Sequence, residues 1–268
     1  MANILALVNQ KGGVGKSTLA VHLAIVLAVQ GYRTLFIDAD PQANSTYSLG
    51  VEATEDSCLQ VFVDRKNVKT PPIHTAEVLP DVSLDVIPAW ITMGLTERWP
   101  DIKSAPDPRA VTDKLRQVVD NIGYDWIIVD GPPHLGYWNQ IVLNLADRAL
   151  IPVPQSGNYP LVGLMQIAST IESVRLRDNA RLQLLGVVST MVDRRTQMGR
   201  TALDRVRIFA DNIHVFETQI PHATAIEWAQ SQKGTNLFAT GRDEPVTESI
   251  VHLMEEVKVR WQQSVGTR

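Results

Sequence analysis

One glycine-rich segment near the N-terminus constrains the fold more than any other part of the chain. Residues 8–24 read VNQKGGVGKSTLAVHLA, and this segment joins a short apolar run at 4–8 to a helical pattern at 16–30. A strand, a glycine-rich turn and a helix in this order direct backbone N–H groups at an anion. The segment departs from the usual phosphate-loop pattern G-x-x-x-x-G-K-[ST], because Gln10 stands where the first glycine belongs. It also carries a second lysine, Lys11, before its glycine pair.

The residue types in this loop suit a nucleoside triphosphate. Gly12, Gly13 and Gly15 would allow the backbone to wrap closely around phosphate oxygens. Lys16 would neutralise the β- and γ-phosphates, and the Ser17 hydroxyl would be offered to Mg²⁺. The structural alternative is a tight glycine turn with no ligand, but the flanking strand and helix both agree with phosphate binding.

Short apolar runs alternate with helical patterns along the rest of the chain. The apolar runs lack a polar residue at every second position, which is typical of a parallel sheet covered on both faces. Strands are expected at residues 4–8, 33–38, 84–87, 126–130, 149–153 and 184–192. Helices are expected at residues 16–30, 109–121, 161–177, 201–211 and 247–261. We therefore predict an α/β fold of the P-loop NTPase type, a mostly parallel twisted sheet with helices on both faces.

The chain is expected to form a single domain over residues 1–268. It is 44% hydrophobic, which suits a sizeable core. The least regular stretch, 63–81, contains three prolines, and we interpret it as a surface excursion. Since the glycine-rich loop begins within the first strand, no N-terminal helix-turn-helix domain is expected.

Acidic residues end two of the expected strands. The segment LFIDADPQANST places Asp38 and Asp40 at the end of one strand, and WIIVDGPP places Asp130 at the end of another. Loops at the carboxyl ends of parallel strands converge on one crevice. An aspartate after an apolar strand supports Mg²⁺ in many nucleotide-binding proteins, usually through water. Either position alone could equally be a turn residue, but the combination with the loop favours a nucleotide site.

Three motifs in order resemble those of one family. The deviant Walker A motif of the ParA/MinD family of ATPases is similar to the run formed by Lys11, Gly12, Gly13, Val14, Gly15, Lys16, Ser17 and Thr18. DADPQ at 38–42 resembles the second motif of the ParA (Soj-like) branch, and DGPP at 130–133 resembles its Walker B and switch II motifs. The similarity continues through nearly the whole chain. It implies ATP and Mg²⁺ as ligands of the Lys11–Thr18 run.

The resemblance also gives the second lysine a role. It implies that Lys16 contacts the nucleotide of its own subunit, while Lys11 reaches the nucleotide of the partner in an ATP-bound homodimer. A cation delivered in this way would stabilise charge that develops on the phosphoryl group. By the same resemblance, Asp40 orients or activates the attacking water, and Asp130 supports Mg²⁺ through water.

The same resemblance implies that Pro221 packs against adenine. The family often has Ile-Pro-Arg-Asn at this point, whereas this chain has IPHA at 220–223. A side-chain amide contact to the base is therefore missing.

Charge patterning indicates a DNA-binding surface. The chain has a net charge of −4, so any such surface must be local. Residues 175–207 contain eight arginines, three aspartates and no lysine, a net charge of +5. We expect the DNA contacts to come from Arg194, Arg200, Arg205 and Arg207. Ordinary solvated surface charge is the alternative. Binding would be non-specific for double-stranded DNA, since no element for reading bases is recognisable.

These inferences predict a ParA-type ATPase that partitions plasmid or chromosome DNA. Such a protein is expected to be cytoplasmic and nucleoid-associated, with a ParB-like adaptor that stimulates slow hydrolysis. The single cysteine, Cys58, agrees with a reducing compartment. Positioning of a protein organelle or cluster on the nucleoid is the second reading. A MinD-like membrane switch is the third, but we expect no membrane partner. The apolar stripe of the terminal helix (Ile250, Leu253 or Met254, Val257 and Trp261) is more often core packing than lipid contact.

Overall fold

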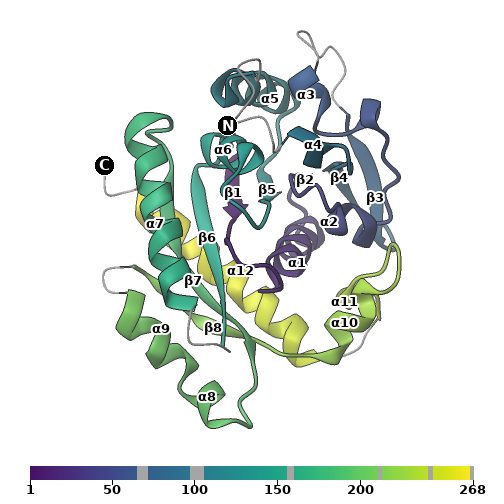
Figure 1. The fold of residues 1–268 in the computed structure, drawn as a ribbon. Helices are drawn as coiled ribbons and strands as arrows, with labels where there is room; N and C mark the ends of the chain where they lie inside the picture. The colour runs from purple at the N-terminus through teal and green to yellow at the C-terminus, as the bar shows by residue number, and fades with distance from the viewer. Residues whose placement is uncertain (65–71, 97–105, 156–159, 211–212, 241–243, 266–268) are drawn as a thin grey trace.

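The protein is built around one twisted sheet. The computed structural model describes residues 1–64, 72–96, 106–155, 160–210, 213–240 and 244–265. Within these ranges it contains an eight-stranded sheet of order β3-β4-β2-β5-β1-β6-β7-β8 (Figure 1). The strands are β1 (Asn3–Leu7), β2 (Thr34–Asp38), β3 (His74–Leu79), β4 (Val82–Ile87), β5 (Trp126–Asp130), β6 (Arg148–Pro154), β7 (Gln183–Val192) and β8 (Val215–Pro221).

All strand pairs are parallel except β3 with β4. Strands β2, β5 and β6 are buried along their whole length, which explains their continuous apolar sequences. Strand β1 lies between β5 and β6, and β5 pairs with β2 on its other side. Asp38 and Asp130 are register partners at the ends of β2 and β5. The predicted mostly parallel sheet is therefore confirmed.

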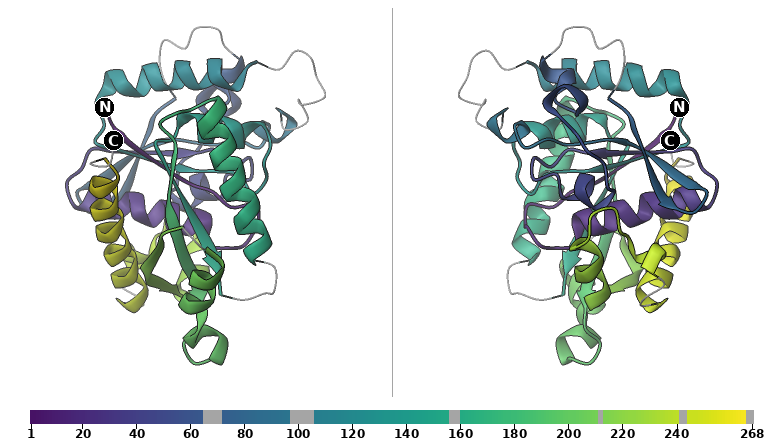
Figure 2. Two further views of the ribbon diagram at one scale, coloured as in Figure 1. Left: turned by 90° about the vertical axis from the view of Figure 1, so that its left-hand side faces the viewer. Right: turned by 90° about the vertical axis from the view of Figure 1, so that its right-hand side faces the viewer.

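Helices cover both faces of the sheet. Figure 2 shows α1 and α12 on one side and α7 on the other. Residues of α1 and α12 share one core cluster, whereas residues of α5, α6, α7 and α9 belong to the other. The helices, including one short 3₁₀ turn, are α1 (Lys16–Val29), α2 (Asn44–Ser48), η1 (Glu55–Ser57), α3 (Val61–Asp64), α4 (Met93–Thr96), α5 (Pro108–Ile122), α6 (Tyr137–Leu145), α7 (Pro160–Arg177), α8 (Gln197–Arg200), α9 (Ala202–Ala210), α10 (Thr224–Gln230), α11 (Leu237–Thr240) and α12 (Glu244–Val265).

The interpretation of 63–81 as an irregular surface excursion was wrong where the structure describes it. Residues 65–71 lie outside the described part of the chain, but β3 forms the antiparallel edge of the sheet. Ala76 and Val78 are buried, and their neighbours Thr75 and Glu77 are exposed. This alternation marks a strand with one solvated face. Asp81, with φ of 62°, makes the tight turn into β4.

The terminal helix α12 packs its apolar stripe against α1 and the sheet. Ile250, Leu253, Met254 and Val257 are at most 1% exposed, and Trp261 makes an edge-to-face contact with Trp126. The stripe therefore belongs to the core, which confirms the preference for core packing over lipid contact. Among the described helices, none is both long enough and apolar enough to traverse a bilayer.

Candidate functional site

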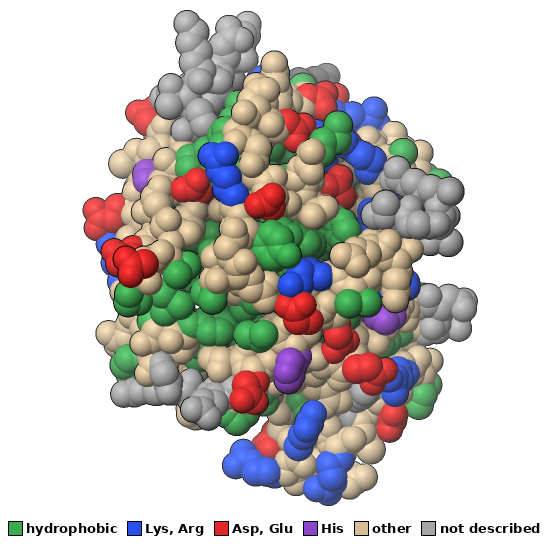
Figure 3. All heavy atoms as spheres, turned by 180° about the vertical axis from the view of Figure 1, so that it is seen from behind, with side chains coloured by type: hydrophobic (Ala, Val, Ile, Leu, Met, Phe, Trp, Pro, Cys, Tyr) green, Lys and Arg blue, Asp and Glu red, His purple; other side chains and the backbone are tan. Residues whose placement is uncertain are grey.

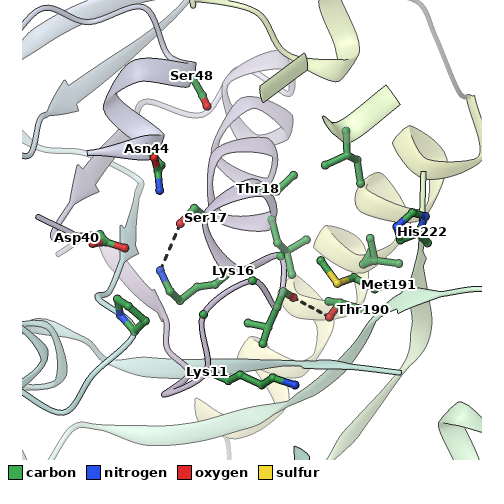
Figure 4. Close-up of a pocket in the computed structure, with 18 of the residues that line it drawn as sticks. Lys11, Lys16, Ser17, Thr18, Asp40, Asn44, Ser48, Thr190, Met191 and His222 are labelled. Atoms are coloured by element: carbon green, nitrogen blue, oxygen red, sulfur yellow. Dashed lines mark hydrogen bonds between the residues drawn. The ribbon is translucent and has the colours of Figure 1, made fainter. Parts of the chain in front are cut away.

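A cavity of about 530 Å³ lies beside the glycine-rich loop. Its walls include the predicted loop residues Lys11, Gly12, Gly13, Val14, Gly15, Lys16, Ser17 and Thr18. Asp40 also lines it, and so does Pro221 at the end of β8. The structure thus brings the loop after the first strand and the end of the last strand together around one space (Figure 4).

The backbone of the loop can come close to a ligand because of its glycines. Gly13 and Gly15 have φ of 70° and 81°, a region that side chains with a Cβ rarely adopt. A Cβ built at Gly12 or Gly13 would meet no described atom within 4 Å, so both positions border open space. Helix α1 begins at Lys16, directly after the loop. Its N-terminal N–H groups and positive dipole end favour an anion such as a phosphate.

Lys16 connects the loop to the end of β5. Its Nζ lies 2.6 Å from Asp130 Oδ1 and 3.4 Å from Ser17 Oγ. The Lys16 and Asp130 side chains are 6% and 0% exposed, so this is a buried ion pair. Asp130 does not line the cavity but lies behind Lys16. Sequence reasoning placed both residues in the site, but it did not predict that they bind each other.

Two buried carboxylates lie next to each other at the ends of neighbouring strands. Asp38 and Asp130 are both 0% exposed and are register partners. Burial, and then repulsion from Asp130, raises the pKa of Asp38 to about 7, against hydrogen bonds donated by Thr46 and the Asp40 backbone. Burial also raises the pKa of Asp40, opposed first by the Gln42 N–H and then by Lys16. For Asp38 and Asp40, burial therefore favours the neutral carboxyl group.

This donor set fits Mg²⁺ held together with a nucleotide. Ser17 and Asp40 offer oxygen atoms at the cavity wall, with Asp130 behind them. Among the described residues, no three His, Cys, Asp or Glu side chains form a ready-made metal cage. Mg²⁺ usually binds through one or two carboxylates plus substrate phosphates, so such a cage is not required.

Lys11 is oriented differently from Lys16. In Figure 4 its side chain extends away from Lys16 and Asp40. Its backbone N–H donates to Asn9 Oδ1 at 2.9 Å, and Asn9 Nδ2 donates to the Pro152 carbonyl at 2.6 Å. Asn9 is buried and therefore anchors the start of the loop to β6. Sequence reasoning missed Asn9, because its partner is 143 residues away in the chain.

The other end of the cavity is mainly apolar. It is lined by Met191, Ile220, Pro221, His222, Ala223, Ile226 and Ile250. Thr190 Oγ1 donates to the Val14 carbonyl at 2.8 Å, which ties the end of β7 to the loop. A flat heterocycle such as a nucleotide base would fit against this apolar wall.

The predicted DNA-binding arginines lie together at the end of the molecule that carries α8. Seen from behind, blue side chains gather at the lower end of the molecule (Figure 3), where Figure 1 places α8. Arg194, Arg200 and Arg207 are exposed, whereas Arg205 is half-buried. Arg207 pairs with Glu217, and Arg200 donates to Gln197 and to the Arg195 carbonyl. Arg195, exposed beside Arg194, pairs with Asp193 and adds to the same surface.

Comparisons with known proteins show which family the chain resembles. The family model described as an AAA domain matches residues 2–184. The chain is 37% identical to the sporulation initiation inhibitor protein Soj of Bacillus subtilis, covering 86% of this chain and 88% of Soj. It is 33% identical to the chromosome-partitioning ATPase Soj of Thermus thermophilus, covering 97% of each.

A solved structure shares the fold. The septum site-determining protein MinD of Pyrococcus horikoshii, complexed with Mg-ADP, superposes with a TM-score of 0.73 at 20% identity, covering 96% of both chains. The order of the three motifs, the cavity around them and the identity to Soj over most of the chain lead to the same assignment. The chain belongs to the ParA/MinD family of deviant Walker A ATPases, in its Soj-like ParA branch.

Proposed function

We propose that this ATP hydrolase uses ATP and Mg²⁺ to switch between a free form and a DNA-bound homodimer. The observation that carries the proposal is the single cavity that gathers the loop, Asp40 and Pro221. Its polar end suits a triphosphate and its apolar end suits a base. The relatives named for chromosome partitioning support a role in moving or spacing DNA.

Within this site, each residue has a distinct task. Lys16 would turn from Asp130 toward the β- and γ-phosphates, and Ser17 and Asp130 would hold Mg²⁺, the latter through water. Asp40, which lines the cavity, orients the attacking water. Lys11 serves the nucleotide of the partner subunit, in line with its orientation away from Lys16. ATP binding and dimerisation then become one event in a two-fold symmetric dimer.

The basic surface around α8 supplies the DNA contacts. Arg194, Arg195 and Arg200 are exposed there, and a dimer doubles the set. Hydrolysis, stimulated by a ParB-like adaptor, releases the protein from the nucleoid. Plasmid or chromosome DNA is our first choice of cargo, and a protein cluster is the second. The buried stripe of α12 disfavours membrane attachment through that helix.

Equilibrium binding to an arbitrary duplex tests the proposal. Wild-type protein with ATP should bind and should lose affinity steeply as salt rises, whereas nucleotide-free protein should bind weakly. Combining Arg194→Glu with Arg200→Glu should weaken binding about tenfold or more while ATP-dependent dimerisation persists. Combining Arg175→Glu with Arg177→Glu reverses the same number of charges at the C-terminal end of α7, away from α8, and is the matched control. Tight binding without nucleotide, or equal binding by the double variant, would contradict the proposal.

A further inference from the structure

The short helix α2 turns two hydroxyl groups toward the buried carboxylates. It follows Asp40 after only three residues. Ser45 Oγ donates to Asp130 Oδ2 at 2.7 Å. Thr46 Oγ1 donates to Asp38 Oδ2 at 2.7 Å, and the Thr46 N–H donates to the same oxygen at 2.9 Å. Both hydroxyl residues are buried, with exposures of 1% for Ser45 and 4% for Thr46.

These two hydroxyls serve different carboxylates. Thr46 Oγ1 also accepts a hydrogen bond from the Ala89 N–H at 3.0 Å, so it joins β2 to the segment after β4. Ser45 instead reaches Asp130, the carboxylate that Lys16 binds through the other oxygen. Asp130 is therefore fixed at Oδ1 by the loop lysine and at Oδ2 by the serine of α2.

Nucleotide binding in the proposed function changes only one of these contacts. When Lys16 turns to the phosphates, Asp130 Oδ1 loses its cation. The hydrogen bond to Oδ2 requires no rearrangement, because Ser45 lies on α2 and not on the loop. A hydrogen bond to an ionised, buried carboxylate is stronger than a neutral one and fixes its direction. Ser45 is then the side chain that continues to orient Asp130.

We propose that Ser45 is a positioning residue of this ATPase, acting through Asp130. Its hydroxyl holds the Asp130 carboxylate in place after Lys16 has moved, so that Oδ1 would remain available to support the metal. It also ties Asp130 to the segment that carries Asp40, which keeps these two carboxylates in one geometry. The inference rests on the proposed nucleotide site and assigns to this site a residue that does not line the cavity.

Mn²⁺ binding measured by electron paramagnetic resonance tests this role without hydrolysis. Mn²⁺ is titrated into protein saturated with a non-hydrolysable ATP analogue. Ser45→Ala should weaken Mn²⁺ about tenfold or more, because loss of a residue that orients a metal-supporting carboxylate has effects of this size. Affinity for the analogue without metal should stay within about twofold, since the loop is intact. In turnover, kcat should fall while KM for ATP changes little.

Three further variants keep the test decisive. Ser45→Thr retains the hydroxyl and should restore most of the Mn²⁺ affinity. Ser45→Cys keeps the volume with a weaker donor and should give a loss even if the alanine variant folds poorly. Ser249→Ala makes the same deletion on α12, where Ser249 Oγ donates only locally to Pro245, and is the matched control.

The outcomes separate this inference from the proposed function. Wild-type Mn²⁺ affinity in a folded Ser45→Ala or Ser45→Cys variant would overturn the positioning role. Equal losses in Ser45→Thr and Ser45→Ala, with both folded, would also overturn it, because the hydroxyl would not be responsible. If wild-type protein failed to bind the analogue at all, the nucleotide site itself would be refuted.

Discussion

Acidification should weaken the fold through one buried histidine behind the phosphate loop. His22 lies on α1 and is 4% exposed. Its Nδ1 is 2.6 Å from the Thr18 carbonyl, and its Nε2 accepts a hydrogen bond from the Leu237 N–H at 3.0 Å. This arrangement requires the neutral ring with the proton on Nδ1. Protonation of Nε2 would place a new N–H of His22 against the Leu237 N–H inside the core, and the hydrogen bond between them would be lost.

The direction and size of the effect follow from the pKa. Burial lowers the pKa of His22 from 6.5 to about 4, against the hydrogen bond to Thr18 that raises it. Between these values the unfolded chain binds a proton that the folded chain does not, so stability is lost as pH falls through 6.5. Moving from about pH 7.5 to about pH 5.5 should remove about 1.4 kcal/mol of unfolding free energy through this residue.

Urea unfolding of wild type and His22→Gln at both pH values measures the difference. The variant should be less stable at neutral pH, because it loses packing and geometry, but its stability should fall less on acidification. His252→Gln, on an exposed position of α12, is the matched control and should behave as wild type. Equal losses in wild type and His22→Gln, or an NMR titration of His22 near pH 6.5, would refute the reasoning.

Three further substitutions test the phosphate contact, the attacking water and the surface around α8. Lys16→Ala should lower affinity for a fluorescent ATP analogue by at least about 100-fold, because the phosphates lose their nearest cation; unchanged affinity would remove Lys16 from the site. Asp40→Ala should still bind ATP and accumulate dimer, but phosphate release should fall by about 100-fold or more. Light scattering measures the dimer and a phosphate assay measures hydrolysis. A variant that hydrolyses ATP at the wild-type rate would contradict the role of Asp40. Gly199→Ala should weaken duplex binding but not ATP binding, because its Cβ would clash with the Asp193 carbonyl oxygen and displace α8. Gly163→Ala, where a Cβ meets no described atom within 4 Å, is its control, and equal DNA binding by the two variants would count against the α8 surface.

The order of buried strands and helices was predictable because each central strand is a continuous apolar run. Strand β8 was missed because Glu217, Thr218 and Gln219 interrupt its apolar residues, although it completes the cavity through Pro221. Strand β3 was missed because the exposed residues Thr75 and Glu77 interrupt its buried ones. Local sequence carries the signals for buried strands, but edge strands depend on neighbours that the sequence does not identify.

The candidate site was predictable to the extent that its residues follow strands. The loop, Asp38, Asp40 and Asp130 all stand at the carboxyl ends of parallel strands, which must meet at one edge of the sheet. The contacts between them were not predictable. Lys16 and Asp130 are 114 residues apart, and Ser45 and Asp130 are 85 apart. Such pairs are set by the register of β2, β5 and α1, and no spacing in the chain reveals them.

Crosslinking at position 11 shows which subunit's nucleotide Lys11 reaches. Lys11→Cys is mixed with a wild-type chain of different mass and an ATP analogue whose γ-phosphate reacts with thiols. The analogue is first bound and photo-fixed to the wild-type subunit through its base. The thiol at position 11 should couple to the analogue held by the other subunit, giving a crosslinked heterodimer. Coupling confined to analogue held by the Lys11→Cys subunit itself would contradict a role for Lys11 across the dimer.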